Sequence, residues 1–388
     1  MPSTHALLSA SGAARWLQCP PSARLCEKFP DTTSEFAREG TDAHELCELK
    51  LRHYFGEITE AEYLSDYKWF TENSDYYSKE MDDCSDAYVD LIDSKMEAFR
   101  EADGQLFEYM VEEKVDFSKY VPNGFGTSDC ILILDDLIEV IDFKYGKGVE
   151  VSAVDNPQMK LYALGAYLKL NLLYDFKTVR MTIFQPRISP EPSEDEISVP
   201  DLLNWAEIYV KPRAQLAIKG EGEFGPSPTA CKFCRAKGEC KARAAENIKA
   251  FDGIKDPALL TDEEAAEYLT KATDFEAWLK DLKDHISQRI GSGHSVPGYK
   301  LVEGRSVRRF SDELAAAKVL MQAGYDEALI YSKNLLSITQ LEKSFGKKEI
   351  QSILGPYIEK PRGNPTLVPE KDKRPALENA GNIVDAFD

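Results

Sequence analysis

The stretch GTSDCILILDDLIEVIDFKYG constrains the fold more than any other part of this 388-residue chain. Two apolar runs flank Asp135-Asp136, and strands separated by two polar residues are typical of a β-hairpin. This turn places Leu134 opposite Leu137, and the same register then pairs Asp129 with Asp142. Directly opposed residues lie about 4.5–5.5 Å apart at Cβ, and like charges at that distance destabilise a sheet. The sequence therefore predicts a cation between these two carboxylates.

Lys144 adds a third charged group to the same place. Side chains alternate along a strand, so Lys144 shares a face with Asp142. Carboxylate oxygens suit Mg²⁺ or Mn²⁺, a bound metal polarises a phosphate, and a lysine stabilises charge or orients water. The pattern therefore favours metal-assisted phosphodiester hydrolysis. A surface hairpin with an acid–lysine pair is the alternative, because D-x-K occurs by chance in many proteins.

The segments around the hairpin predict a mixed α/β protein. LFEYMVEEKV and KTVRMTIFQPR are typical of strands, and residues 60–103 and 200–219 of helices. A helix after the hairpin begins at Asn156, a good capping residue, followed by Pro157 at the first helical position.

Three motifs in this order resemble the RecB-like branch of the PD-(D/E)XK nuclease superfamily. They are G-T-S-D ending at Asp129, D-F-K from Asp142 to Lys144, and Q-M-K-L-Y from Gln158 to Tyr162. The resemblance implies an α/β core with a mixed central sheet flanked by helices. It also implies that both aspartates and the lysine are catalytic, and that Gln158 and Tyr162, four residues apart on one helical face, position the DNA strand.

The same family uses a histidine on an N-terminal helix as a metal ligand. By resemblance His44, in GTDAHELCE, takes this role; the segment lacks the second histidine of a zinc-protease motif. Only one of Glu112 and Glu113 can face the site if the strand alternates regularly, and we expect Glu113 to be the further ligand.

Three cysteines share one short basic loop, CKFCRAKGEC. Cys231, Cys234 and Cys240 have C-x2-C-x5-C spacing, which resembles the cluster site of Cas4 proteins and AddB-type nucleases. In those proteins an early cysteine completes a [4Fe–4S] site, and Cys19 stands at that position here, with Cys26 as a spare candidate. Zinc is the alternative occupant, because four-cysteine sites often hold zinc.

The C-terminal part resembles segments of an uncharacterised phage and prophage family, in GYKLVEGRSVRRF and KPRGNPTLVPEKDKRPAL. Thr261 and Glu264 form a capping-box signature for a charged helix to about residue 290, with one or two strands after it. Arg305, Arg308 and Arg309 form a basic cluster that can hold DNA phosphates or guard a solvated strand edge.

We therefore expect three parts. They are a nuclease domain at 1–249 that includes the cysteine loop, an accessory α+β region at 250–355, and an extended or disordered tail at 356–388.

Net charge and composition place weak limits on function. The charge of −20 argues against nonspecific binding through a wholly basic surface, but not against a local DNA site. Neither a long apolar run nor a signal peptide is evident, so we expect a protein of the cytoplasm, of the host cell if the chain is phage-encoded, with no membrane partner.

The leading hypothesis is a Mg²⁺- or Mn²⁺-dependent DNA exonuclease acting on linear DNA in phage replication or recombination. Its protein partner would be a single-strand annealing or single-strand-binding protein. The alternatives are a noncatalytic DNA-binding scaffold with structural zinc and a structure-specific endonuclease within a complex.

Overall fold

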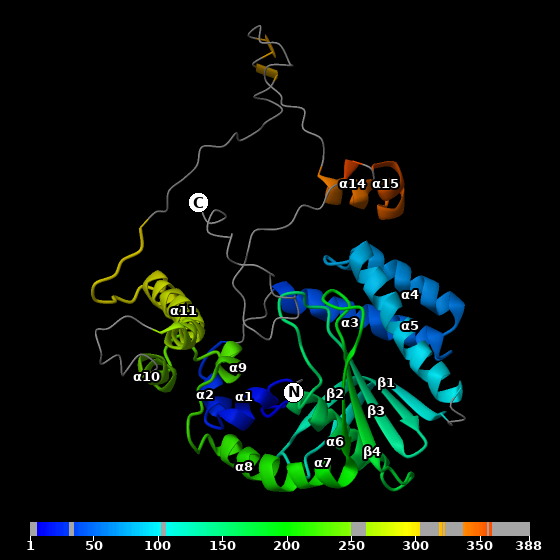
Figure 1. Cartoon of the computed structure of the whole chain (residues 1–388), viewed down its shortest axis with the longest axis horizontal. Coiled ribbons are helices and arrows are strands. Elements are labelled where there is room, and N and C mark those ends of the chain that lie inside the picture. Colours follow the sequence, from blue (N-terminus) through cyan, green and yellow to red (C-terminus); the bar gives the residue numbers. More distant parts are fainter. Residues whose placement is uncertain are drawn as a thin grey trace. The chain divides into compact units, whose positions relative to one another are not determined.

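A computed structural model describes residues 6–30, 35–101, 106–249, 261–302, 318–319, 321–322, 337–354 and 357–358 (Figure 1). The chain divides into two compact units, Met1–Val302 and Glu303–Asp388. In the second unit the structure describes helices α14 (Ile338–Phe345) and α15 (Lys347–Leu354).

The first unit contains a five-stranded sheet with the order β1-β2-β3-β4-β5. The strands are β1 (Leu106–Asp116), β2 (Phe125–Leu134), β3 (Leu137–Phe143), β4 (Thr178–Phe184) and β5 (Ser193–Ser198). Neighbouring strands are antiparallel except β3 and β4, which are parallel. A parallel pair needs a crossover connection, and helix α6 (Pro157–Leu170) supplies it. The predicted mixed sheet is therefore confirmed.

Helices pack on both faces of this sheet (Figure 1). Besides α6, the described residues of this unit form α1 (Ala13–Gln18), α2 (Ser22–Cys26), α3 (Glu35–Tyr54), α4 (Glu60–Asn73), α5 (Lys79–Glu101), α7 (Val199–Trp205), the π-helix η1 (Ala206–Val210), α8 (Lys211–Lys219), α9 (Pro228–Lys232), α10 (Lys241–Lys249) and α11 (Asp262–Gly291). The last three, α9 to α11, contribute no residue to the two cores that cover the sheet. Alternation along β2 divides its side chains between two cores. Ile131 and Ile133 pack with α6, α1 and α7, whereas Cys130 and Leu132 pack with α3 and α5.

The predicted hairpin is confirmed. Leu134 pairs with Leu137, and the two aspartates between them form the turn. Asp135 has φ 45°, a left-handed conformation that aspartate tolerates in turns. The backbone N–H of Lys177 donates to the carbonyl of Asp136 at 2.8 Å, which ties the start of β4 to the turn.

The N-terminus of α6 also forms as predicted. The side-chain oxygen of Asn156 accepts hydrogen bonds from the backbone N–H of Gln158 at 3.0 Å and of Met159 at 3.4 Å. Pro157 occupies the first helical turn. This cap fixes the start of the helix, and with it the direction of the next polar side chains on that helical face.

The long helix α11 packs against the cysteine loop. Its Asp281 forms ion pairs with Lys237 at 3.0 Å and with Arg243 at 2.6 Å. A Cβ added to Gly238 would lie 2.8 Å from the Cβ of His285, so this loop needs a glycine to approach the helix so closely. The capping box of α11, Thr261 with Glu264, is confirmed.

Several C-terminal predictions lie outside the described residues. Of the predicted strands in GYKLVEGRSVRRF, only residues 298–302 are described, and these form no strand. The tail at 356–388 falls outside the described part of the chain except for residues 357–358. The boundaries predicted at 249/250 and 355/356 stay predictions.

Candidate functional site

Asp129 and Asp142 lie side by side, one residue beyond the last hydrogen-bonded pair of β2 and β3, Cys130 with Ile141. Oδ2 of Asp129 also accepts a hydrogen bond from the backbone N–H of Phe143 at 2.7 Å. The hairpin register therefore holds two buried carboxylates together, 9% and 2% exposed. Such a pair is costly without a neutralising charge nearby.

Three ligand-type side chains from three elements converge beside this pair. One ligand atom each of His44 on α3, Glu112 on β1 and Asp129 on β2 lie within 4.8 Å of one another. Nδ1 of His44 lies 3.4 Å from Oδ2 of Asp129, and the histidine ring meets the ring of Phe143 edge-on at 5.7 Å. The donor set of one imidazole and two carboxylates suits a divalent cation such as Mn²⁺ or Mg²⁺.

The pKa shifts in this group follow from burial and from its charges. Burial lowers the pKa of His44, but the charge and hydrogen bond of Asp129 outweigh burial and raise it to about 9. Burial raises the pKa of Asp129, yet His44 and then Lys144 hold it below its usual value. Burial, followed by the charge of Asp129, raises the pKa of Glu112 to about 7. The neighbouring carboxylates thus favour the protonated, positively charged form of His44.

Glu112, and not the predicted Glu113, faces this group. Glu112 has φ 49°, which interrupts the regular alternation of β1. Val111 packs in the core on the α3 side, whereas Val115, four residues later, packs in the core on the α6 side. Glu113 instead forms an ion pair with Lys169 of α6. The expectation for Glu113 rested on regular alternation and is wrong for that reason.

Asp142 and Lys144 form the second half of the site. Nζ of Lys144 lies 2.8 Å from Oδ2 of Asp142. Burial lowers the pKa of Lys144, but the charges of Asp142 and Asp129 outweigh burial, so its pKa lies above the usual value and the ammonium persists. Burial raises the pKa of Asp142, and Lys144 opposes that shift. A half-buried positive charge is therefore fixed beside the carboxylates of Asp142 and Asp129.

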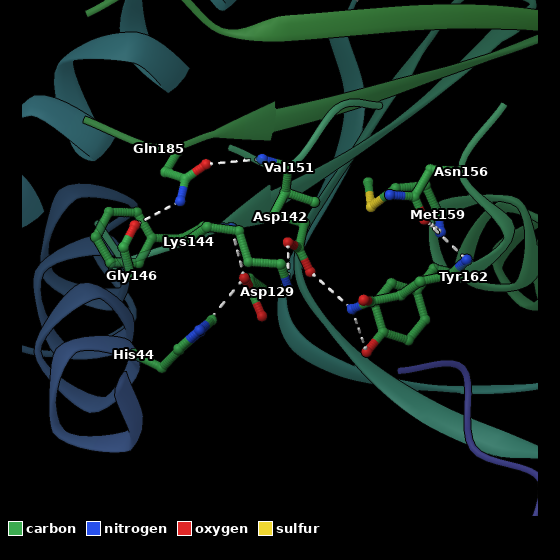
Figure 2. Close-up of polar contacts among 12 residues, drawn as sticks. His44, Asp129, Asp142, Lys144, Gly146, Val151, Asn156, Met159, Tyr162 and Gln185 are labelled. Carbon is green, nitrogen blue, oxygen red and sulfur yellow. Dashed lines mark hydrogen bonds and ion pairs between the residues drawn. The ribbon is translucent and has the colours of Figure 1, made fainter. Parts of the chain in front are cut away.

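Gln158 and Tyr162 reach the site from α6, and Figure 2 labels Tyr162 beside Asp142. Nε2 of Gln158 donates to Oδ1 of Asp142 and to the hydroxyl oxygen of Tyr162, both at 3.3 Å. A Cβ added to Gly126 on β2 would lie 2.6 Å from Cε1 of Tyr162, so only glycine leaves room for this ring. The structure thus brings five predicted residues together with His44, and it adds Glu112.

Two further residues, which sequence reasoning missed, hold the segment after Lys144. Gln185 and Arg187 follow β4, and both side chains are almost fully buried. Gln185 binds the backbone of Val149 and Val151, where Figure 2 shows its contact with Val151, and Arg187 binds the carbonyl of Tyr145. FQPR carries no local signal for such contacts, because they form only when β3 and β4 pair.

The four predicted cysteines line one cavity. Cys19, at the end of α1, shares it with Cys231, Cys234 and Cys240, although Cys19 and Cys231 lie more than two hundred residues apart in sequence. Sγ of Cys26 lies 3.7 Å from Sγ of Cys234. That hydrogen bond, opposed by burial and assisted by the charge of Arg15, lowers the pKa of Cys26 to about 5. Cys47, Cys84 and Cys130 lie elsewhere, buried in the core on the α3 side of the sheet.

The predicted DNA-binding residues Arg305, Arg308 and Arg309 lie outside the described residues. Within the part of the chain that the structure describes, no helix is both long and apolar enough to cross a membrane.

A family model described as "Protein of unknown function (DUF2800)" matches residues 5–375. The chain belongs to the DUF2800 family. The match includes the acidic site, the cysteine loop and most of the C-terminal region.

Two solved structures show distant likeness to this DUF2800 chain. One is described as a "Putative exonuclease" from Eubacterium rectale, with a TM-score of 0.32 and 13% identity over 66% of this chain and 92% of the other. The second, SSO0001, has a TM-score of 0.20 and 16% identity over 51% of this chain and 95% of the other. At these TM-scores the likeness supports no functional assignment.

Proposed function

We propose that the protein is a metal-dependent deoxyribonuclease that removes nucleotides from the ends of linear DNA. One observation carries the proposal: the His44, Glu112 and Asp129 group lies directly beside the Asp142–Lys144 pair. Ordinary structural ion pairs do not need three carboxylates that converge from three neighbouring strands. Metal-assisted hydrolysis of a phosphodiester does need such a donor set next to a fixed cation.

The residues fit a divalent cation. His44, Glu112 and Asp129 would hold it, and Asp142 supplies further carboxylate oxygen beside them. When bound, Mg²⁺ or Mn²⁺ polarises a phosphate oxygen and lowers the pKa of an attacking water. The pKa of Glu112, raised by burial and then by the charge of Asp129, supports this fit, because a bound cation would offset both effects and stabilise the ionised carboxylate.

The remaining side chains orient the reaction. The Lys144 ammonium, held by Asp142, provides a positive charge for the developing charge on the phosphate or for alignment of the water. Gln158 contacts both Asp142 and Tyr162, so one helical face connects the carboxylates with a hydroxyl that can position the DNA strand.

We further propose that the cysteine cavity holds a [4Fe–4S] cluster. Four thiols around one cavity are the donor set that such a cluster requires. The bound group would connect the end of α1 with α9 and the cysteine loop after it. These segments are about two hundred residues apart in sequence, and holding them together costs chain entropy that the four bonds to the bound group would offset. Colourless protein with stoichiometric zinc would instead identify a structural zinc site.

The test is a time course with end-labelled linear DNA and either Mg²⁺ or Mn²⁺. We expect wild-type protein to degrade the DNA progressively from an end, and Lys144→Ala to abolish degradation. Lys177→Ala is the matched control, because Lys177 is an exposed lysine beside the β2–β3 turn, at the opposite end of β3 from Lys144.

Other results point to other functions. Cleavage of covalently closed circular DNA would indicate a structure-specific endonuclease. Binding without metal-dependent cleavage would indicate a DNA-binding scaffold. If the protein acts in phage recombination in the host cytoplasm, its expected partner is a single-strand annealing protein. Adding such a protein to the cleavage assay tests this partnership.

A further inference from the structure

The segment directly after Lys144 is exposed from Gly146 to Glu150. Within it Lys147 stands between Gly146 and Gly148, and among the described residues it has no ion-pair partner. The loop follows β3, which carries Asp142 and ends one residue before Lys144, so it begins next to the acidic site, where Figure 2 labels Gly146.

Neither glycine is explained by the fold. Gly146 and Gly148 both have φ values outside the left-handed region, and a Cβ added at either position would have no atom within 4 Å. Neither backbone conformation nor packing therefore requires glycine at positions 146 and 148. Glycine also occurs where a ligand must approach the backbone closely, and this explanation fits both positions.

The loop is nevertheless held in place at several points by Gln185. Its Nε2 donates to the carbonyls of Gly146 and of Val149, the latter at 2.9 Å. Its Oε1 accepts from the backbone N–H of Val151 at 3.0 Å. The amide is 6% exposed and uses both donor hydrogens and its oxygen on the backbone of this one loop.

Arg187 holds the beginning of the same loop. Its guanidinium lies over the ring of Tyr145 at 4.2 Å and donates to the Tyr145 carbonyl at 3.3 Å. Ion pairs with Glu39 on α3 at 3.1 Å and with Glu80 on α5 at 2.9 Å anchor it in turn. Two buried side chains, Gln185 and Arg187, thus hold the backbone of this exposed loop in place.

We propose that the Gly146–Glu150 loop binds a DNA backbone phosphate through Lys147 and the backbone at its two glycines, and that Gln185 is the positioning residue that presents this loop. This proposal rests on the proposed nuclease function, and it identifies where the protein would bind the DNA strand next to the bond that is cleaved. A preorganised backbone element with one lysine recognises a phosphate irrespective of base sequence.

The experiment measures binding of a fluorescein-labelled linear duplex with a single-stranded end by fluorescence polarisation across a salt series. Ca²⁺ replaces Mg²⁺ and Mn²⁺. Lys147→Gln should weaken binding several-fold and reduce the salt slope by about one, the effect of one lost phosphate contact. Gly148→Ala should weaken binding without lowering the melting temperature. Lys177→Gln, at the far end of the sheet, is the control and should bind as wild type does.

Gln185→Met keeps the side-chain volume and removes the three hydrogen bonds. It should weaken DNA binding and speed amide hydrogen exchange at residues 146–151, whereas Lys147→Gln should leave that exchange unchanged. If wild type binds DNA but Lys147→Gln and Gly148→Ala bind with the same affinity and salt slope, the loop proposal is overturned. If wild type neither binds nor cuts linear DNA, the nuclease function itself fails, and the loop proposal fails with it.

Discussion

Separate glutamine substitutions at Glu112 and Glu113 test which of the two glutamates belongs to the proposed metal site. The two neighbours differ sharply in surroundings. Glu112 lies with His44 and Asp129, whereas Glu113 pairs with Lys169 on α6. The substitutions are nearly identical in volume and each removes one negative charge, so each serves as the control for the other.

The magnitude for Glu112 follows from its pKa, which rises from 4.5 to about 7, chiefly through burial. One pKa unit corresponds to about 1.4 kcal/mol, so the ionised carboxylate costs the metal-free fold about 3 kcal/mol above pH 7. Between pH 4.5 and 7 the folded state binds more protons than the unfolded state, and the free energy of unfolding therefore falls as pH rises through this window. Below pH 4.5 both states are protonated and the penalty vanishes.

Glu112→Gln should therefore stabilise the metal-free protein at pH 8, by up to about 3 kcal/mol, and have little effect near pH 4. Glu113→Gln removes only a partly exposed ion pair, worth up to about 1 kcal/mol, and should destabilise slightly. The measurement is urea unfolding by circular dichroism in the presence of a chelator at the two pH values.

Metal binding should then narrow the stability difference between the two variants. Ligand at a hundred times its Kd stabilises a fold by about 2.7 kcal/mol, so Mn²⁺ should raise the stability of wild type and of Glu113→Gln at pH 8. Glu112→Gln should gain much less. If Glu113→Gln loses the Mn²⁺ response while Glu112→Gln keeps it, the assignment of the metal centre to Glu112 is refuted.

The remaining predictions concern the supporting structure. Gly126→Ala should destabilise the fold by about 1–3 kcal/mol and reduce DNA cleavage, because the new Cβ would displace the ring of Tyr162; urea unfolding and the cleavage assay measure both, and wild-type behaviour would contradict the packing. Asn156→Ala should cost about 1 kcal/mol through loss of the α6 cap, measured in the same way, and a neutral effect would show that the cap is dispensable. Cys19→Ser should remove the broad absorbance at ~400 nm expected of the proposed cysteine-ligated cluster, whereas Cys26→Ser should retain it; the opposite pattern would make Cys26 the ligand.

The paired aspartates were predictable because every step from sequence to site was local. Strand period and turn length determine a hairpin register, and Asp129 and Asp142 lie within eight residues of the turn. Lys144 followed from its spacing to Asp142, and the Asn156 cap from residue type. Short-range geometry therefore carried most of the acidic site.

Glu112 was not predictable because the rule that selects between neighbouring strand residues assumes regular backbone. The positive φ of Glu112 changes which side chain faces the site, and no residue type in MVEEK predicts a positive φ at this position. Such strained positions are found where a site demands a side chain that regular geometry would direct elsewhere. The φ of 49° at Glu112 is consistent with the metal-binding role proposed for this residue.

The contacts around the cysteine loop show a third kind of limit. A domain boundary is predicted at 249/250, yet the helix that follows it, α11, packs back on the cysteine loop. Asp281 forms ion pairs with both Lys237 and Arg243, and the Arg243 side chain is only 7% exposed. An arginine so deeply buried needs its acidic partner, because an unpaired buried charge is strongly destabilising. By these contacts α11 stabilises the loop that carries Cys234 and Cys240, so the cysteine site depends on residues on both sides of the predicted boundary.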